Sequence, residues 1–220
     1  MTITDNLQFI QQQLPKSVKL VAVSKTKTTD QILEAYQSGQ RLFGENKVQE
    51  LITKWQLLPK EIEWHFIGHL QSNKVRPIIP FVALIHGVDS FRLLETINKE
   101  AEKYGRIVSV LLEFHIAAEE SKFGLSLSEA EEMLSSPEWD NLKNISVNGV
   151  MGMATFTEDE SVIKSEFELL SDIFRQLKEK YFRDSDRFCE LSMGMSDDYK
   201  IAISAGSTLV RIGSKIFGTR

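Results

Sequence analysis

Lys25 is the residue whose type and position most directly suggest chemistry. It follows the apolar run of residues 20–24, Leu-Val-Ala-Val-Ser. Burial at the end of a strand disfavours a charged ammonium group, and the unprotonated amine is the form that attacks an aldehyde. Lys27 lies two residues further on in a similar setting, so a solvated lysine at the strand end is the alternative. The spacing makes Lys25 a candidate for Schiff-base formation.

A second candidate site lies near the C-terminus, where Arg211 is followed by Gly213 and Ser214. Glycine lets backbone N–H groups approach an anion closely. Residues 192–196, Ser-Met-Gly-Met-Ser, follow the preceding predicted strand, so Ser192 begins a second glycine-containing loop. Parallel barrels often bind phosphate after their seventh and eighth strands. The pattern fits a phosphate site, with two ordinary glycine turns as the alternative.

Weaker candidates occupy the ends of other predicted strands. Asn46 follows residues 43–45, Phe-Gly-Glu, where a helix cap is favoured over contact with a ligand. His69 lies in a polar loop, and Met151 ends a strand where methionine more often packs than binds. The four histidines lack the spacing of a zinc-binding helix, so no metal site is predicted. Cys189 falls inside a predicted strand and is expected to be a small buried hydrophobe.

These residues must be positioned by a fold, and the chain alternates apolar strand-type runs with helical stretches. Strands are predicted at residues 19–23, 41–44, 64–67, 82–88, 107–114, 145–151, 188–191 and 207–211. Helices are predicted to start at the cap candidates Thr29 and Asp30, to cover 46–57, to end near Tyr104, and to cover 128–135 and 161–180. Eight repeats indicate a parallel sheet. The candidate residues recur after strands all round the chain, which favours an α/β, single (β/α)₈ TIM barrel over an open doubly wound sheet.

Length and composition set the class of protein. The 220 residues, 42% hydrophobic and 26% charged, fit one domain over 1–220, with residues 1–14 as an extra N-terminal helix. A net charge of −5 without a basic patch argues against nucleic acid as a partner. No apolar run reaches the roughly 20 residues of a membrane helix. The single cysteine and the absence of a signal-like N-terminus predict a cytoplasmic protein, and no apolar stripe is left over, so we expect a monomer.

Taken together, several segments resemble the pyridoxal 5′-phosphate (PLP) homeostasis protein family, also called the YggS/PROSC type. The matching segments occur in the family's order and cover nearly the whole chain. They are residues 21–26 (Val-Ala-Val-Ser-Lys-Thr), 43–46 (Phe-Gly-Glu-Asn), 65–74 (His-Phe-Ile-Gly-His-Leu-Gln-Ser-Asn-Lys), 119–124 (Glu-Glu-Ser-Lys-Phe-Gly), 191–198 (Leu-Ser-Met-Gly-Met-Ser-Asp-Asp) and 210–218 (Val-Arg-Ile-Gly-Ser-Lys-Ile-Phe-Gly).

The resemblance implies a barrel like the N-terminal domain of alanine racemase, with PLP as the cofactor. Lys25 would hold PLP as a Schiff base. Arg211 would reach the pyridine nitrogen and keep it unprotonated, which weakens the ring as an electron sink. Other residues would complete the site: Ser192, Gly213 and Ser214 at the phosphate, Asn46 near the ring or its 3-hydroxyl, and His69 and Met151 at the mouth.

The resemblance also implies a function: a non-catalytic, PLP-binding protein of intracellular PLP homeostasis and amino-acid and keto-acid balance, with PLP-dependent apoenzymes as possible recipients. The alternative is a PLP-dependent amino-acid racemase or lyase that uses Lys25 as a base. Alanine racemases take an opposing acid or base from a second domain and a partner subunit, and this chain has no room for that domain. A third hypothesis is a signalling adaptor that uses PLP structurally.

Overall fold

A closed barrel of parallel strands forms the centre of the molecule. The computed structural model describes residues 2–118 and 123–218, and across these residues eight strands pair in sequence order, with β8 closing the barrel onto β1. The strands are β1 Lys19–Val23, β2 Leu42–Glu45, β3 Glu63–Phe66, β4 Leu84–Val88, β5 Val108–Glu113, β6 Ile145–Met151, β7 Glu190–Ser192 and β8 Leu209–Ile212. The predicted (β/α)₈ barrel is confirmed.

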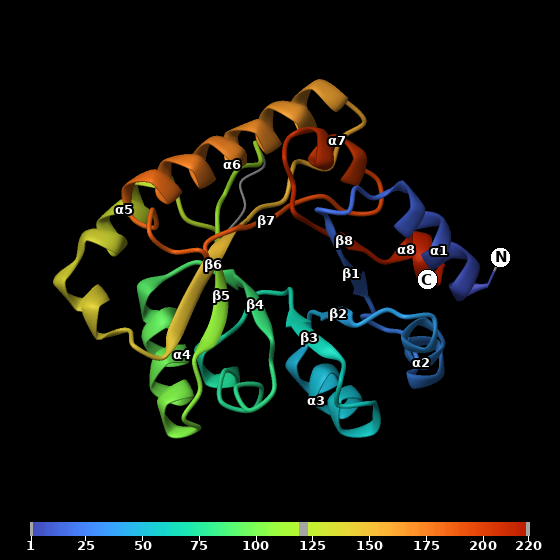
Figure 1. Ribbon diagram of the computed structural model, residues 1–220. Coiled ribbons are helices and arrows are strands. Elements are labelled where there is room, and N and C mark those ends of the chain that lie inside the picture. Colours follow the sequence, from blue (N-terminus) through green and yellow to red (C-terminus); the bar gives the residue numbers. More distant parts are fainter. Residues whose placement is uncertain (1, 119–122, 219–220) are drawn as a thin grey trace.

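Helices surround the barrel (Figure 1). They are α1 Ile3–Gln13, α2 Thr29–Gln37, α3 Val48–Leu57, α4 Phe91–Lys103, α5 Leu127–Ser135, α6 Glu160–Lys180, α7 Tyr199–Ser204 and α8 Ser214–Phe217, with short 3₁₀ turns at Ser72–Lys74 and Pro137–Asn141. Helix α1 precedes the first strand and lies beside α8, where the Asn6 amide donates to the carbonyl of Ile216 at 3.0 Å. None of the helices in the described part of the chain combines the length and apolarity needed to span a bilayer.

The period of two along each strand sends alternate side chains to different cores. On β1, Leu20 and Ala22 pack outward against the helices in the large core. Val21 points into the barrel, where it forms a small separate cluster with Leu84, Leu111, Met151 and Leu209. The same interior also holds polar side chains near the carboxyl ends of the strands, and these position the site.

Three local predictions were wrong. Cys189 is exposed, because β7 begins one residue later, at Glu190. The cap of α2 is Thr28 rather than Thr29 or Asp30: its hydroxyl accepts from the N–H of Gln31 in a capping box. Asn46 does not cap α3, whose N-cap is Lys47 without a side-chain hydrogen bond. The amide of Asn46 is therefore available for another role.

Candidate functional site

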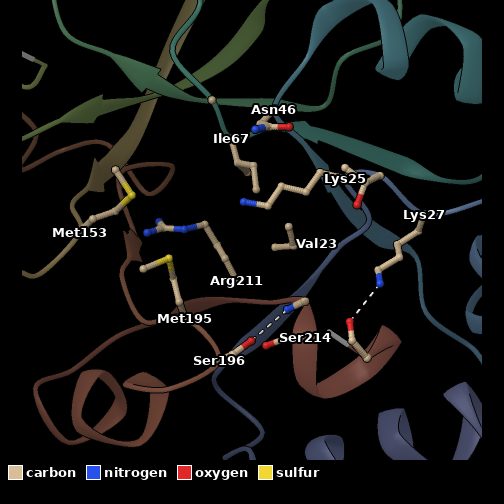
Figure 2. A pocket seen from close by; sticks show the side chains of 14 residues that line it. Val23, Lys25, Lys27, Asn46, Ile67, Met153, Met195, Ser196, Arg211 and Ser214 are labelled. Atoms are coloured by element: carbon tan, nitrogen blue, oxygen red, sulfur yellow. Dashed lines mark hydrogen bonds between the residues drawn. The ribbon is translucent and has the colours of Figure 1, made fainter. Parts of the chain in front are cut away.

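A cavity of about 390 Å³ lies at the carboxyl ends of the strands (Figure 2). Residues that follow β1, β2, β3, β6, β7 and β8 line it, as expected for the shared mouth of a barrel. Of the eight residues predicted as a site from the sequence, five line this cavity: Lys25, Asn46, Arg211, Gly213 and Ser214. We call it the mouth pocket.

Lys25 and Lys27 differ in what they contact, which separates the two alternatives left by the sequence. The Lys25 side chain extends into the mouth pocket, with its amine on the side that faces Arg211 (Figure 2). The Lys27 amine instead donates to the carbonyls of Phe217 and Gly218, at 3.3 and 3.0 Å. Within the described residues no hydrogen bond holds the Lys25 amine, which leaves it available to react.

The backbone around Lys25 makes a strained turn. Thr26 has a φ of 66°, the left-handed region that a β-branched residue rarely adopts. A residue held in such a conformation costs of order 1–3 kcal/mol and persists only where its surroundings impose it. The N–H of Lys27 closes the turn onto the carbonyl of Ser24 at 3.0 Å. The turn directs Lys25 away from the β1 ladder and into the pocket.

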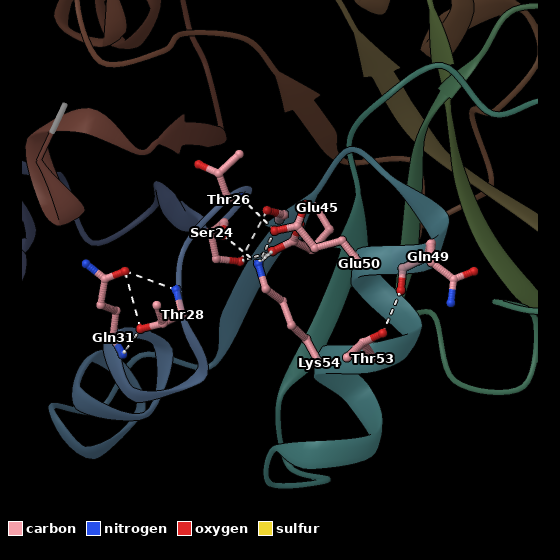
Figure 3. A network of polar contacts seen from close by, with 10 residues as sticks. Ser24, Thr26, Thr28, Gln31, Glu45, Gln49, Glu50, Thr53 and Lys54 are labelled. Atoms are coloured by element: carbon pink, nitrogen blue, oxygen red, sulfur yellow. Dashed lines mark hydrogen bonds and ion pairs between the residues drawn. The ribbon is translucent and has the colours of Figure 1, made fainter. Parts of the chain in front are cut away.

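A buried ionic network meets this turn from outside the barrel (Figure 3). The Lys54 amine of α3 donates to the carbonyl of Ser24 at 2.8 Å and to carboxylate oxygens of Glu45 and Glu50 at 2.7 and 2.6 Å. The hydroxyl of Ser24 donates to Glu45 at 2.6 Å, and the N–H of Thr26 donates to Glu50 at 2.6 Å. We call Glu45, Glu50 and Lys54 the α3 network.

The pKa values of the two carboxyl groups in the α3 network are shifted in opposite directions. Burial raises the pKa of Glu45, against the opposing hydrogen bonds from Lys54 and Ser24. Burial also acts to raise the pKa of Glu50, but hydrogen bonds from Lys54 and from the N–H of Thr26 outweigh it and hold that pKa below its ordinary value. Glu50 is therefore the firmly ionised partner of Lys54. Sequence reasoning missed this network; the only signal was a Glu–Lys pair at i and i+4, which is usually solvated.

Arg211 is held from inside the barrel. One terminal nitrogen, Nη1, donates to the carbonyl and hydroxyl oxygens of Ser192 at 3.0 and 2.5 Å, and Nη2 donates to the carbonyl of Gly152 at 3.0 Å. Burial lowers the pKa of Arg211 to about 10, which still leaves the guanidinium charged at neutral pH. Its position is fixed by oxygen acceptors rather than by a close carboxylate.

Two buried histidines extend this contact toward the bottom of the barrel. Nδ1 of His86 lies 3.1 Å from the hydroxyl of Ser192, and Nε2 of His86 lies 2.9 Å from Nδ1 of His65. A guanidinium only donates, so Ser192 accepts from Arg211 and has one proton left for His86, which in turn donates to His65. Burial lowers the pKa of His65 to about 3, and burial together with the charges of His65 and Arg211 lowers that of His86. We call Ser192, His86 and His65 the histidine chain; both of its imidazoles are neutral.

Glu113, at the end of β5, is a further buried group that the sequence did not reveal. Burial raises its pKa to about 7, and the negative charge of Asp89 adds to that effect. Arg211 acts in the other direction, because a nearby cation favours the carboxylate. Glu113 thus changes its charge near neutral pH.

Two serines and a glycine line the far side of the mouth pocket. Gly213 precedes α8, and its N–H donates a hydrogen bond to the hydroxyl oxygen of Ser196 at 3.3 Å. A Cβ at position 213 would lie 3.1 Å from the carbonyl of Val23, so glycine allows β8 to pass close to β1 here. Ser196 and Ser214 line the same pocket. Hydroxyl and backbone N–H groups therefore gather at one end, opposite the Lys25 amine.

Three predicted residues lie elsewhere. Ser192 is fully buried beneath the pocket, in the histidine chain, and Met151 belongs to the apolar cluster inside the barrel. His69 is exposed and packs against Phe123, with 4.0 Å between ring centroids and the rings tilted by 30°, and its Nδ1 lies 3.7 Å from a carboxylate oxygen of Asp89. The place that the sequence gave to Ser192 at the pocket is taken in the structure by Ser196, four residues later.

Comparisons with known proteins agree with this fold. A family model described as the N-terminal domain of alanine racemase matches residues 1–220. The pyridoxal phosphate homeostasis protein of Pasteurella multocida is 37% identical, over 100% of this chain and 98% of its own length. The human protein of the same name is 41% identical, over 92% of this chain and 76% of its own length.

Solved structures give the same picture. PipY of Synechococcus elongatus, solved with PLP bound, is 34% identical and superposes with a TM-score of 0.88, covering 99% of this chain and 100% of that chain. Alanine racemase from E. faecalis has a TM-score of 0.73 at 17% identity and covers 58% of that chain, which is a likeness of fold alone. Fold and site thus define a barrel of the alanine racemase N-terminal type. Within that class, the chain belongs to the pyridoxal phosphate homeostasis protein family.

Proposed function

We propose that this protein binds PLP as a Schiff base on Lys25 and serves intracellular PLP homeostasis without catalysing a reaction of its own. One observation carries the proposal: the Lys25 amine, which has no hydrogen-bond partner in the described residues, faces the buried guanidinium of Arg211 across the mouth pocket. Ser196, Gly213 and Ser214 line the far end of this pocket, and we call them the anion cup. The names of its relatives and the PLP bound to PipY support the same ligand.

The donor set fits PLP group by group. The Lys25 amine adds to the aldehyde carbon, a C=N bond forms, and water leaves. Arg211 has N–H groups beyond those bound to Ser192 and Gly152, and they can donate to the ring nitrogen. Ser196, Gly213 and Ser214 are placed to hold the phosphate, and Asn46 to lie beside the ring. When bound, the cofactor supplies an aldehyde and an electron-withdrawing ring.

The pocket lining supports a binding role over a catalytic one. A two-base racemase needs a second acid or base opposite its lysine. Among the described residues that line the mouth pocket there is no carboxylate, histidine or tyrosine. Arg211 stays protonated, so it donates a hydrogen bond to the ring nitrogen without protonating it, and the ring remains a weak electron sink.

We extend the proposal to the setting of the protein. Its one cysteine, Cys189, is free, which fits a reducing cytoplasm. We propose a monomer that takes up PLP and passes it to PLP-dependent apoenzymes. The exposed side chains of Met153 and Met195 at the rim of the pocket leave room for the ligand to enter and leave.

Absorbance titration with PLP tests the ligand and the lysine together. The wild-type protein should develop the yellow band of a Schiff base, and Lys25→Ala should lose it. Lys27→Ala is the matched control, because its amine is bound to the C-terminal carbonyls, and it should keep the band. A band that survives in Lys25→Ala and disappears in Lys27→Ala would overturn the assignment.

Exchange of amino-acid α-protons in deuterated water tests the absence of catalysis. The PLP-loaded protein should exchange them no faster than free PLP does. Sustained exchange that depends on Lys25 would make the protein a racemase or lyase, and would leave the binding assignment intact.

A further inference from the structure

The strained turn after Lys25 is the starting point. Within the described chain, Thr26 is the one non-glycine residue with a positive φ. Glycine or asparagine would adopt this conformation with less strain. The surroundings must therefore impose it on threonine, and the contacts of Ser24 and Thr26, the two neighbours of Lys25, show how.

On the outer side of the barrel, the hydrogen bonds to Ser24 and Thr26 come from side chains of the α3 network. Glu50 accepts the N–H of Thr26, Lys54 donates to the carbonyl of Ser24, and Glu45 accepts the hydroxyl of Ser24. None of these three charged side chains lines the mouth pocket. The α3 network thus grips the peptide on both sides of Lys25 and stays out of reach of a ligand (Figure 3).

Stability alone is a poor reason for such a network. Lys54 is 5% exposed and Glu45 is fully buried, and one oxygen of Glu45 has no hydrogen-bond partner among the described residues. Removing charges from water costs free energy that an ion pair often fails to recover, and the best-supported benefit is a specified conformation. The conformation specified here is the turn that carries Lys25.

We propose that Glu50 and Lys54, backed by Glu45, are positioning residues that set the approach of the Lys25 amine to the aldehyde of PLP. This inference rests on the proposed function. Addition of the amine needs the nitrogen to approach the carbonyl carbon from one face of the aldehyde, at an obtuse angle to the C=O bond, and a small misplacement of an attacking group slows its reaction strongly. The α3 network should thus govern the rate of Schiff-base formation and leave the affinity of the anion cup unchanged.

The experiment compares Glu50→Ala with Glu168→Ala, a matched glutamate of an exposed i,i+4 pair with Lys164 on α6. Two quantities are measured: the rate constant of Schiff-base formation by stopped-flow absorbance, and the affinity for pyridoxine 5′-phosphate, which keeps the ring and phosphate and lacks the aldehyde. Glu50→Ala should slow the reaction by about tenfold or more and keep the affinity within about twofold. Glu168→Ala should change neither quantity.

Two rescues separate positioning from general damage. Glu50→Gln keeps an oxygen for the N–H of Thr26 and should recover most of the rate. Thr26→Gly adopts a positive φ without strain, so the double variant Glu50→Ala/Thr26→Gly should also recover it. If Glu50→Ala alone does not fold, the double variant should still form the Schiff base at about the rate of Thr26→Gly, and a rate about tenfold lower than that would overturn the inference.

A wild-type rate in Glu50→Ala, or an equal loss of rate and of pyridoxine 5′-phosphate affinity, would overturn the inference. Hydrogen exchange of the Thr26 amide in the cofactor-free protein adds a readout that needs no PLP: Glu50→Ala should exchange faster, and an unchanged rate would count against the grip. A wild-type protein that forms no Schiff base would instead overturn the proposed function. The exchange of the Thr26 amide is measured without PLP, so it would still show whether the α3 network holds the turn.

Discussion

The two sides of the mouth pocket are held by different kinds of contact. Lys25 is held through its neighbours' backbone and hydroxyl groups by charged side chains that lie between the barrel and α3. Arg211 is held through its own side chain by neutral groups inside the barrel, the histidine chain and the carbonyl of Gly152. The lysine that must react keeps its amine unbound, and the arginine that must stay in place has its guanidinium fixed.

The difference follows from what each side chain has to do. A reactive amine cannot be tied down by a hydrogen bond, so its position is set through the main chain. A permanently charged guanidinium can be bound by neutral acceptors, and the low pKa values of His65 and His86 keep further positive charge away from it. Four predictions test whether the charged α3 network and the neutral histidine chain differ in their effects on stability and on PLP binding.

The largest effect should come from Lys54→Met. This substitution leaves Glu45 buried without its cation, and breaking a buried ion pair costs about 3–5 kcal/mol of unfolding free energy. Urea denaturation at pH 7 measures it. Lys164→Met, which removes a lysine of an exposed pair, should cost less than about 1 kcal/mol. If both variants lose the same small amount of unfolding free energy, the ion pairs of the α3 network contribute no more than an exposed pair does.

Because of the histidine chain, we expect the free energy of unfolding to depend on pH. The pKa of His65 falls from an ordinary value near 6.5 to about 3, so its contribution is complete above pH 6.5 and is lost as the pH falls toward 3. Between pH 7 and 5 the loss amounts to about 2 kcal/mol. Glu113, with its pKa raised to about 7, acts with the opposite sign over the same range.

The informative quantity is therefore the difference between the wild type and His65→Leu, measured by urea denaturation at pH 7 and pH 5. The wild type should lose about 2 kcal/mol more than His65→Leu on acidification. Replacement of the exposed His115 by glutamine is the control and should leave the wild-type pH dependence in place. A His65→Leu variant with the wild-type pH slope would mean that His65 is not buried in its neutral form.

A smaller effect is expected for Ser192→Ala. It removes the hydroxyl between Arg211 and His86, and a hydrogen bond to a charged group contributes about 1.5–3 kcal/mol. We expect affinity for PLP to fall by about tenfold, the lower end of that range. Equilibrium dialysis measures it, with Ser204→Ala on the surface of α7 as the control. If Ser192→Ala binds PLP as tightly as the control does, Arg211 does not need the histidine chain.

The smallest effect concerns Thr26→Gly in the cofactor-free protein. Relief of the left-handed strain is offset by the greater chain entropy of glycine, so the unfolding free energy should stay within about 1 kcal/mol of wild type. Thr53→Gly, at an exposed position inside α3, should be destabilising by only a few tenths of a kcal/mol, because threonine is itself a weak helix former. Thermal denaturation compares the two. A loss of about 2 kcal/mol or more for Thr26→Gly would mean that the turn is not strained.

The sequence predicted the barrel because eight apolar runs alternate with helical stretches, a pattern that survives errors of one or two residues at each end. The same small errors matter at the site. The seventh strand was predicted over 188–191 and is observed as Glu190–Ser192. This shift placed Cys189 in the strand and Ser192 in the loop, although Cys189 is exposed and Ser192 points into the barrel.

Lys25 and Arg211 could be predicted because each ends a strand whose apolar run is easy to recognise. The α3 network could not, since a glutamate and a lysine four residues apart on a helix usually face water. Only the packing of α3 against β2 and β3 buries Lys54 beside the turn. The histidine chain was hidden for a related reason: His65 and His86 lie on the neighbouring strands β3 and β4, and Ser192 of β7 reaches His86 only across the closed barrel.

Peptide mapping after borohydride reduction tests the central claim most directly. The wild-type protein is loaded with PLP, reduced, digested and analysed by mass spectrometry for the lysine that carries the pyridoxyl group. We predict a single modified peptide, the one that contains Lys25, and no modified peptide at that position in Lys25→Ala. A reduced adduct on Lys27 or on any other lysine in place of Lys25 would contradict the assignment of the reactive amine.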